Sequence, residues 1–253
     1  MPHETKPHSM PHVIISCMDR RLNLHLDLHC GPDDVILRNA GANVKGLDHT
    51  IRSLLASGYE HFDILTHTDC AAMRYVREVL AGTAIPVSET FARLAKQFEG
   101  EDPQKLDERN CEVQRKALEQ IMRDSDARGA RASCMSIDLN AIGAAMAPQP
   151  HTFLSVLTLL RHESYAGIQE HMSAGGASSY FLQAGGIDEL MPDINLAVSV
   201  LGIRDVRLVV TRHSDEAGAA QAARSIASSD ALRHHNVTLS TVHLPSVTIV
   251  SGK

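Results

Sequence analysis

The sequence of 253 residues lacks the features that mark membrane, secreted and nucleic-acid-binding proteins. No apolar run approaches the roughly 20 residues that a membrane span needs. The N-terminal MPHETKPHSMPH has no apolar core of the kind found in a secretion signal. No basic tract occurs and the net charge is −6, so neither nucleic acid nor an anionic membrane surface is an expected partner. These absences predict a soluble, cytoplasmic protein.

Cysteine is also scarce. The five cysteines are Cys17, Cys30, Cys70, Cys111 and Cys134. An odd, widely spaced set in a cytoplasmic chain argues against a disulfide framework. Metal binding, or burial as small apolar side chains, is therefore the favoured interpretation of these residues.

Apolar segments of two kinds are present, and they alternate along the first half of the chain. Strand-like segments lie at 12–16, 34–41, 62–67 and 130–139. Helix-favouring segments lie between them, at 47–58, 71–82 and 88–127. Gly58 supplies a stop signal for the first of these helices. Strands that alternate with helices predict parallel βαβ units and an α/β fold.

A second alternating half follows a small, proline-bearing segment at 141–151, which is expected to be a linker. Strand-like segments recur at 151–160, 179–186, 205–213 and 236–244. Helix-favouring segments recur at 161–172, 192–202 and 216–232. The sequence therefore predicts two domains, residues 1–148 and residues 149–253, each with enough apolar residues for a core.

Three chemically distinct side chains occupy alternate positions in the segment ISCMDRRL, residues 15–22: Cys17, Asp19 and Arg21. Alternate residues of an extended segment point to the same side. A second motif places His67 and Cys70 where a strand gives way to a helix. The carboxyl ends of parallel strands frame the ligand crevice of an α/β sheet, so the two motifs are expected to meet.

Two thiolates and an imidazole are good zinc ligands, and three protein ligands leave the fourth tetrahedral position open, as in catalytic zinc sites. Taken alone, each motif has a simpler interpretation. A single cysteine in a strand is usually a small buried side chain, and His-x-x-Cys occurs by chance in many proteins. The combination, in this order and at strand ends, is far rarer and favours a metal site.

The motifs CMDRRL (17–22), VILRNAGA (35–42), IRSLL (51–55) and HTDCAAM (67–73) resemble those of β-class carbonic anhydrases. The resemblance covers roughly residues 10–140. It implies that Cys17, His67 and Cys70 bind zinc, and that the fold is the parallel-sheet fold of that family.

The resemblance also implies a reaction. Asp19 and Arg21 would form the family's dyad beside the metal, with Asp19 accepting a hydrogen bond from zinc-bound water and Arg21 keeping Asp19 ionised. Carbon dioxide would then be hydrated to bicarbonate. Asn39 and Gly41 are candidates for the substrate pocket, although a turn and backbone role explains them as well.

Departures from the family pattern and rival functions remain open at this stage. Ala71 stands where the family usually has glycine, and Arg20 where a small residue is common. Carbon disulfide and carbonyl sulfide hydrolases keep the same ligands, so they are alternative functions. A non-catalytic zinc-binding regulatory protein is another, although the Asp19–Arg21 pair argues against it. A nucleotide-binding site is not indicated, because no Gly-x-Gly-x-x-Gly follows a strand.

The second half shows a weak likeness to the first, with ILRNAGANV aligned on YFLQAGGID and FDILTHTDC on VRLVVTRHSDE. In this alignment His213 matches His67, Glu216 matches Cys70, and Leu157 falls near Cys17. Such a site could not assemble the zinc shell. Because β-class enzymes pair two folds, we expect residues 149–253 to be a metal-free copy that acts as a built-in partner. The chain would be a pseudo-dimer with one zinc ion, and the family resemblance also allows a homo-oligomer.

Overall fold

The computed structural model describes residues 11–22, 30, 34–139, 153–158, 180–211 and 214–244. The predicted helix at 161–172 and the aligned His213 lie outside these residues. In the first half, the strands are β1 (His12–Cys17), β2 (Val35–Asn39), β3 (His61–His67) and β4 (Arg131–Ile137). The helices are α2 (Asp48–Ala56), α3 (Ala71–Leu80), α4 (Glu89–Lys96) and α5 (Leu106–Asp124). Short 3-10 turns are η1 (Arg20–Leu22), η2 (Ala40–Ala42), η3 (Val44–Leu47) and η4 (Pro103–Lys105).

The second half repeats the alternation of strands and helices. Its strands are β5 (Leu154–Leu157), β6 (Tyr180–Gln183), β7 (Asp205–Val210) and β8 (Thr238–His243). Its described helices are α7 (Ile187–Ser199), α8 (Glu216–Ala227) and α9 (Asp230–His234). The predicted α/β class is confirmed. Within the part of the chain that the structure describes, no helix is both long and apolar enough to span a membrane.

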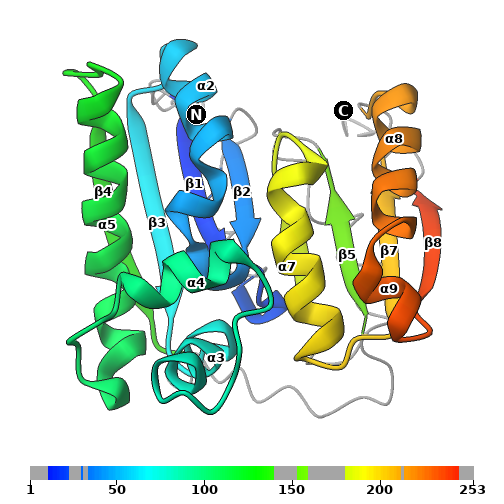
Figure 1. The fold of residues 1–253 in the computed structure, drawn as a ribbon. Coiled ribbons are helices and arrows are strands. Elements are labelled where there is room, and N and C mark those ends of the chain that lie inside the picture. The colour runs from blue at the N-terminus through cyan, green and yellow to red at the C-terminus, as the bar shows by residue number, and fades with distance from the viewer. Residues whose placement is uncertain are drawn as a thin grey trace, which may run out of the picture.

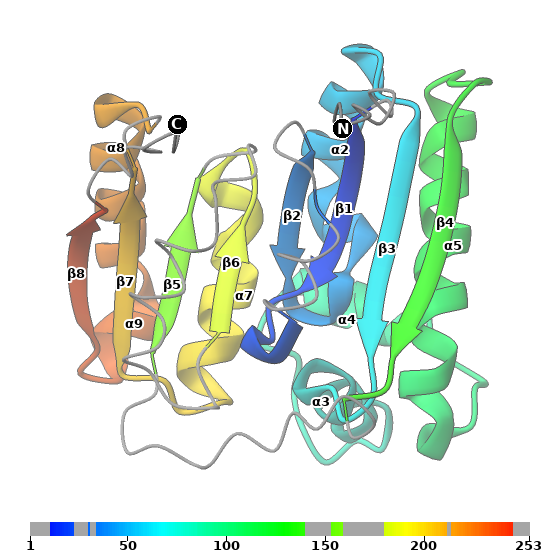
Figure 2. The same ribbon diagram turned by 180° about the vertical axis from the view of Figure 1, so that it is seen from behind.

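All eight strands form one sheet, in the order β4-β3-β1-β2-β6-β5-β7-β8. Neighbouring strands are parallel except at the centre, where β2 pairs with β6 in the antiparallel sense. Strands β1–β4 therefore end at one edge of the sheet and β5–β8 at the opposite edge. The described α-helices of both halves cover the same face of the sheet, in front of it in Figure 1 and behind it in Figure 2.

The strand order is symmetric about the β2–β6 pair. Within each half the first strand lies between the second and the third, and the fourth lies outermost. One antiparallel junction and helices on a common face correspond to a two-fold rotation about an axis perpendicular to the sheet (Figure 1). The two halves of the sheet thus have the same topology.

The core has two layers because successive strand residues point to opposite faces. The face covered by helices holds the main cluster, to which β1 contributes Val13, Ile15 and Cys17. The other face holds a smaller cluster that includes Ile14 and Leu157. A residue of the second half can correspond to a residue of the first half only if both lie on the same face of the sheet.

One cysteine pair departs from the sequence-based expectation. Cys111 on α5 and Cys134 on β4 are disulfide-bonded, with Cα atoms 5.8 Å apart, whereas Cys17, Cys30 and Cys70 are not disulfide-bonded. Metal binding or simple burial, the favoured interpretation of the cysteines, was wrong for this pair. Connectivity cannot be deduced from cysteine spacing, and it is the packing of α5 along β4 that brings the two residues together.

Candidate metal centre

The three predicted metal ligands meet where β1 and β3 end. These strands are parallel neighbours, so their last residues, Cys17 and His67, lie at the same edge of the sheet. Figure 2 shows that β3 ends next to α3. Cys70 directly precedes α3. The ligand atoms of the three residues all lie within 4.8 Å of one another, and the two Sγ atoms are 3.9 Å apart. All three side chains are buried.

The orientation of His67 indicates a ligand rather than a core histidine. Its Nδ1 lies 2.8 Å from the carbonyl oxygen of Thr68, so Nδ1–H donates and Nε2 is the ring nitrogen left for a metal ion. That Nε2 is buried and has no hydrogen-bond partner. A buried polar atom without a partner is costly. Here the ligand atoms of His67 and the two cysteines lie within 4.8 Å of one another, close enough to share one metal ion. The donor set of one imidazole and two sulfurs fits a metal ion such as zinc.

Charge is shared unequally within the cluster. The hydrogen bond with Cys70 and the charge of His67 lower the pKa of the Cys17 thiol, although burial opposes the shift. The same hydrogen bond and burial raise the pKa of Cys70. Burial opposes a charge on His67, but the neighbouring Cys17 outweighs it and raises the pKa of His67 to about 9. The site therefore already separates charge between Cys17 and His67.

Asp19 and Arg21 form the predicted pair beside the cluster. The Arg21 guanidinium donates to both carboxylate oxygens of Asp19, with Nη2 2.7 Å from Oδ2 and Nε 3.0 Å from Oδ1. The Arg21 backbone N–H also donates to Oδ1, at 2.9 Å. Burial alone would raise the pKa of Asp19, but the Arg21 bonds and the charge of His67 outweigh it and lower that pKa. Asp19 is held ionised and in one orientation.

Arg21 is anchored in turn by the loop that carries the ligands. Its Nη1 lies 3.2 Å from Oδ2 of Asp69, and its Nη2 lies 3.3 Å from the Asp69 carbonyl oxygen. Asp69 also accepts a hydrogen bond from Arg74, and its backbone N–H donates to Asp107 at 3.1 Å. Sequence reasoning missed Asp69. Its position between the two ligands in HTDC is the signal that could have found it.

Arg38 is a second residue that sequence reasoning missed. Its fully buried guanidinium donates to the carbonyl oxygens of Cys17, at 3.1 and 3.2 Å, and of Asp19, at 2.7 Å. These bonds fix the backbone of the segment that holds both the ligand and the carboxylate. The RNAG motif gave a signal, but it does not reveal which side of the sheet Arg38 occupies.

Asn39 and Gly41, the predicted pocket residues, lie at the end of β2 and in the turn that follows it. Asn39 is fully buried, and its side-chain N–H donates to the carbonyl oxygen of Asn43 at 2.8 Å. Gly41 has a φ of 73°, and its carbonyl oxygen accepts from Asn110 at 2.8 Å. A Cβ at Gly41 would lie 2.9 Å from Cε of Met73 in α3. These contacts account for both residues as supports of the turn.

We expect Gly41→Ala to lower the free energy of unfolding by about 2–4 kcal/mol. The substitution combines the cost of positive φ with overpacking against Met73. Gly82→Ala is the matched control, because Gly82 has a similar φ of 70° and nothing within 4 Å of the added Cβ. It should cost only about 1–2 kcal/mol. Urea denaturation of both variants measures the difference, and equal losses would contradict the close approach at Gly41.

The second half reaches the site through the start of β6. Tyr180 forms an isolated antiparallel bridge with Asp19, and the Phe181 N–H donates to the Met18 carbonyl oxygen at 2.8 Å. Burial, with the negative charges of Asp19 and Cys17, raises the pKa of Tyr180 to about 12. The phenol is thus a neutral group beside the site. Sequence reasoning missed Tyr180 because its approach depends on the β2–β6 junction.

Helix α7 of the second half contacts the first half through two carboxyl groups. Glu189 accepts from the backbone N–H of Thr50 at 3.0 Å. Asp193, which is buried, accepts from the backbone N–H of Ala40 at 3.0 Å. Burial raises the pKa of Asp193 to about 8, against an ordinary value of 3.8, and the charge of Cys17 acts in the same direction.

We expect this carboxyl group to make stability fall with rising pH. Between about pH 4 and pH 8 the Asp193 carboxyl is ionised in the unfolded chain but protonated in the folded one. Unfolding then releases a proton, so its free energy falls by up to about 1.4 kcal/mol per pH unit, with no further loss above pH 8. Asp193→Asn keeps an acceptor for Ala40 and removes this loss.

Urea denaturation of the native protein and Asp193→Asn at pH 5, 6.5 and 8 tests this prediction. The variant should gain stability relative to the native protein as pH rises, by about 2 kcal/mol or more overall. All other titrating groups are common to both proteins and cancel. A constant difference between the two would contradict the raised pKa.

Strand pairing shows which second-half residues correspond to the ligands. Ile15 lies in the main core between Leu37 of β2 and Ile64 of β3. In the other half, Val156 lies in the main core between Leu182 of β6 and Leu208 of β7. These two rows face the helices and occupy the same place in each half.

Cys17 lies two residues after Ile15, and Thr158 lies two residues after Val156, so Thr158 corresponds to Cys17. His67 lies three residues after Ile64, and Thr211 lies three residues after Leu208, so Thr211 corresponds to His67. Asp215 precedes α8 as Cys70 precedes α3. The sequence alignment of Leu157 with Cys17 is therefore one residue out, because Leu157 faces the other side of the sheet. Among the described residues, only Cys17, His67 and Cys70 form a group able to hold a metal ion.

Comparisons with known proteins agree with these motifs. No family model matches the sequence. A carbon disulfide hydrolase from Acidianus sp. (strain A1-3) is 37% identical over 73 residues, which are 27% of this chain and 35% of that protein. The chain thus matches about a third of the length of this curated relative.

A structural match is found with one chain from the crystal structures of two tetrameric β-carbonic anhydrases of the filamentous ascomycete Sordaria macrospora. It has a TM-score of 0.39 and 16% identity, and it covers 53% of this chain and 78% of that one. The partial identity with a carbon disulfide hydrolase and the Cys–His–Cys cluster make this chain similar to the β-class carbonic anhydrases and their relatives. The resemblance predicted from the sequence is confirmed at this level.

Proposed function

We propose that the chain binds one zinc ion through Cys17, His67 and Cys70 and catalyses the reversible hydration of carbon dioxide to bicarbonate. The observation that carries the proposal is the partnerless Nε2 of His67 between two thiols, beside an ionised Asp19. Zinc held there would act as a Lewis acid that makes water a nucleophile near neutral pH. Side chains of the protein would orient the water and shape the substrate pocket.

Asp19 would align the attacking water by accepting a hydrogen bond from it. Its side chain is only 7% exposed, so few water molecules compete for the carboxylate. Arg21 holds both carboxylate oxygens and lowers the tendency of Asp19 to take up a proton. Asn39 and Gly41 would shape the substrate pocket through the turn that they support, rather than by binding the substrate.

Hydrolysis of carbon disulfide or carbonyl sulfide is the second candidate function. The observation that favours it is the partial identity with a carbon disulfide hydrolase. Both reactions begin with attack of an activated water on a linear molecule with a central carbon, so the same ligands and the same Asp19–Arg21 pair serve either one. A rate assay with each substrate therefore decides between carbon dioxide and the sulfur compounds.

Metal analysis combined with two rate assays tests the proposal. Purified protein is assayed for zinc, for stopped-flow hydration of carbon dioxide, and for release of hydrogen sulfide from carbon disulfide. Zinc with rapid hydration supports the proposal, and zinc with sulfide release alone supports the second candidate. Zinc with neither activity would indicate a non-catalytic zinc protein, and absence of zinc would refute all three.

We also propose that residues 149–253 are a degenerate, metal-free copy of residues 1–148. The symmetric strand order supports this, as do threonines at the positions of Cys17 and His67. The copy would act as a built-in partner, since Tyr180 lies beside Asp19 and Asp193 bonds to Ala40. One zinc ion per chain follows. Assembly into a homo-oligomer and a cytoplasmic location stay predictions.

A further inference from the structure

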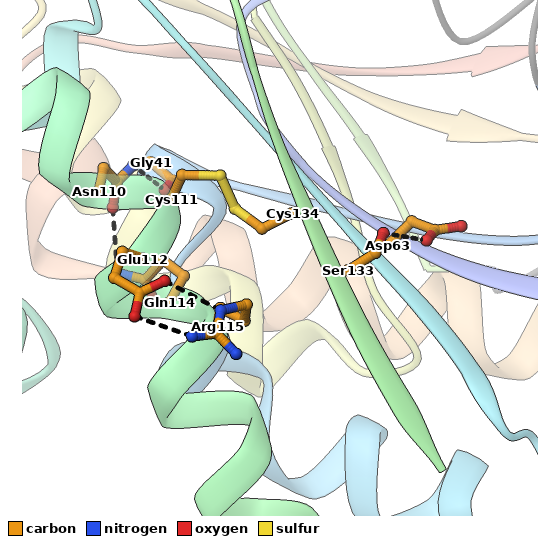
Figure 3. Close-up of a disulfide and its surroundings, with 9 residues drawn as sticks. All are labelled: Gly41, Asp63, Asn110, Cys111, Glu112, Gln114, Arg115, Ser133 and Cys134. Carbon is orange, nitrogen blue, oxygen red and sulfur yellow. Dashed lines mark hydrogen bonds and ion pairs between the residues drawn. A yellow bond between two sulfur atoms is a disulfide. The ribbon is translucent and has the colours of Figure 1, made fainter.

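The disulfide between Cys111 and Cys134 joins the long helix α5 to the edge strand β4 (Figure 3). Its Cα separation of 5.8 Å is typical of protein disulfides. Both residues are partly exposed. The bond closes a loop between residues 23 positions apart, and no step of the proposed reaction uses it.

Helix α5 supports the metal centre from one side. In its first turn, Oδ2 of Asp107 accepts from the backbone N–H of Asp69, between two ligands, at 3.1 Å. Asn110, next to Cys111, donates to the carbonyl oxygen of Gly41 at 2.8 Å, as Figure 3 shows. Gly41 in turn packs against the start of α3, which follows Cys70.

Strand β4 supports the metal centre from the other side. Ile137, three residues after Cys134, pairs with His67. The carbonyl oxygen of Ile137 accepts from the Thr68 N–H at 3.0 Å, and the Thr68 hydroxyl accepts from the Leu139 N–H at 3.2 Å. The loop from His67 to Cys70 is thus held between the two elements that the disulfide joins.

We propose that Cys111 and Cys134 are a site of reversible thiol–disulfide exchange that controls how firmly the protein retains its metal. In the oxidising direction, two thiols lose two protons and two electrons and form the S–S bond. A low-molecular-weight disulfide takes up the two protons and the two electrons and is reduced to two thiols. A dithiol drives the reverse reaction. The inference rests on the proposed metal site but not on which substrate is turned over.

The full chain, loaded with zinc, is compared after treatment with oxidised glutathione and after treatment with a phosphine reductant that is then removed. Thiol titration of the denatured protein should find three free thiols in the first state and five in the second. Zinc loss to an excess of EDTA should be roughly 2- to 30-fold faster in the reduced state, the range typical of linked sites. The melting temperature should fall by about 5–10 °C.

Two variants separate this cysteine pair from the metal-binding cysteines. Cys134→Ser should behave as reduced protein after either treatment, whereas Cys30→Ser, at a cysteine that is neither disulfide-bonded nor in the cluster, should respond like the native chain. Equal zinc loss in the two states would overturn the proposal, and so would a redox response that persists in Cys134→Ser. A chain that takes up no zinc refutes the proposed function instead, while the thiol count and melting temperature still decide whether the exchange occurs.

Discussion

Cys70→Ser is expected to abolish stoichiometric metal binding and, with it, catalysis. The native chain should contain one zinc ion, and the variant should bind zinc at least about 100-fold more weakly, since even partners outside the ligand shell change metal affinity 10- to 100-fold. A serine hydroxyl is a poor zinc donor beside a thiolate. Elemental analysis after dialysis against a defined free zinc concentration measures the change.

The geometry makes each ligand indispensable. The cluster supplies three donor atoms within 4.8 Å of one another, and no other such group occurs among the described residues. Removal of one donor leaves two protein ligands, short of the three that catalytic zinc sites use. Cys17→Ser and His67→Ala should therefore match Cys70→Ser in both metal content and rate.

Two control variants test whether the loss of zinc is specific to the three ligands. Cys30→Ser makes the same chemical change at a cysteine that is neither disulfide-bonded nor in the cluster, and it should leave the zinc content unchanged. Thr211→Ala alters the second-half position that corresponds to His67 and should also keep one zinc ion. Two zinc ions per native chain, or full occupancy in Cys70→Ser, would contradict the assignment of a single site and the proposal of a metal-free second copy.

The sequence predicted that the three candidate metal ligands would lie together, because each is positioned by a local rule. Cys17 and His67 are the last residues of strands β1 and β3, and parallel strands place their ends together. Helix α2 also follows its sequence signals, and Gly58 takes a positive φ of 88° just after the helix. Chemistry carried by strand ends and helix starts is visible in a single sequence.

Features that depend on pairing between distant segments were not predicted. The antiparallel contact of β2 with β6 brings Tyr180 to Asp19, and nothing local to either residue signals it. The alignment of Leu157 with Cys17 failed for a related reason. A match of residue types does not show which face of the sheet each residue occupies. A shift of one residue in the alignment moves every side chain to the opposite face.

Helix α7 shows a third limit of sequence reasoning. A start at Pro192 was expected, because proline favours the first turn of a helix. The helix begins at Ile187 instead, and Pro192 lies inside it. The buried residues Ile187, Leu190 and Ile194 form one stripe, so tertiary packing outweighs the local preference of proline.

Asp19→Asn is expected to keep the metal and lose most of the rate. Asparagine has nearly the same shape and keeps one oxygen that can accept from Arg21, so the fold and the three ligands should be undisturbed. It lacks the negative charge that aligns the attacking water. Loss of a positioned hydrogen-bonding or proton-accepting group typically costs about 10²- to 10³-fold in rate. The assay uses whichever of the two substrates the native chain turns over.

Asp69→Asn is the matched control for Asp19→Asn. Asp69 also bonds to Arg21, but its side chain is 52% exposed, whereas the Asp19 side chain is 7% exposed. Exposed ion pairs contribute little because water competes for them, and asparagine tolerates the positive φ of 56° at this position. Its rate should stay within about 3-fold of the native value. If the two variants lost rate equally, Asp19 would act only by holding Arg21, and the carboxylate beside the metal would have no part in aligning water.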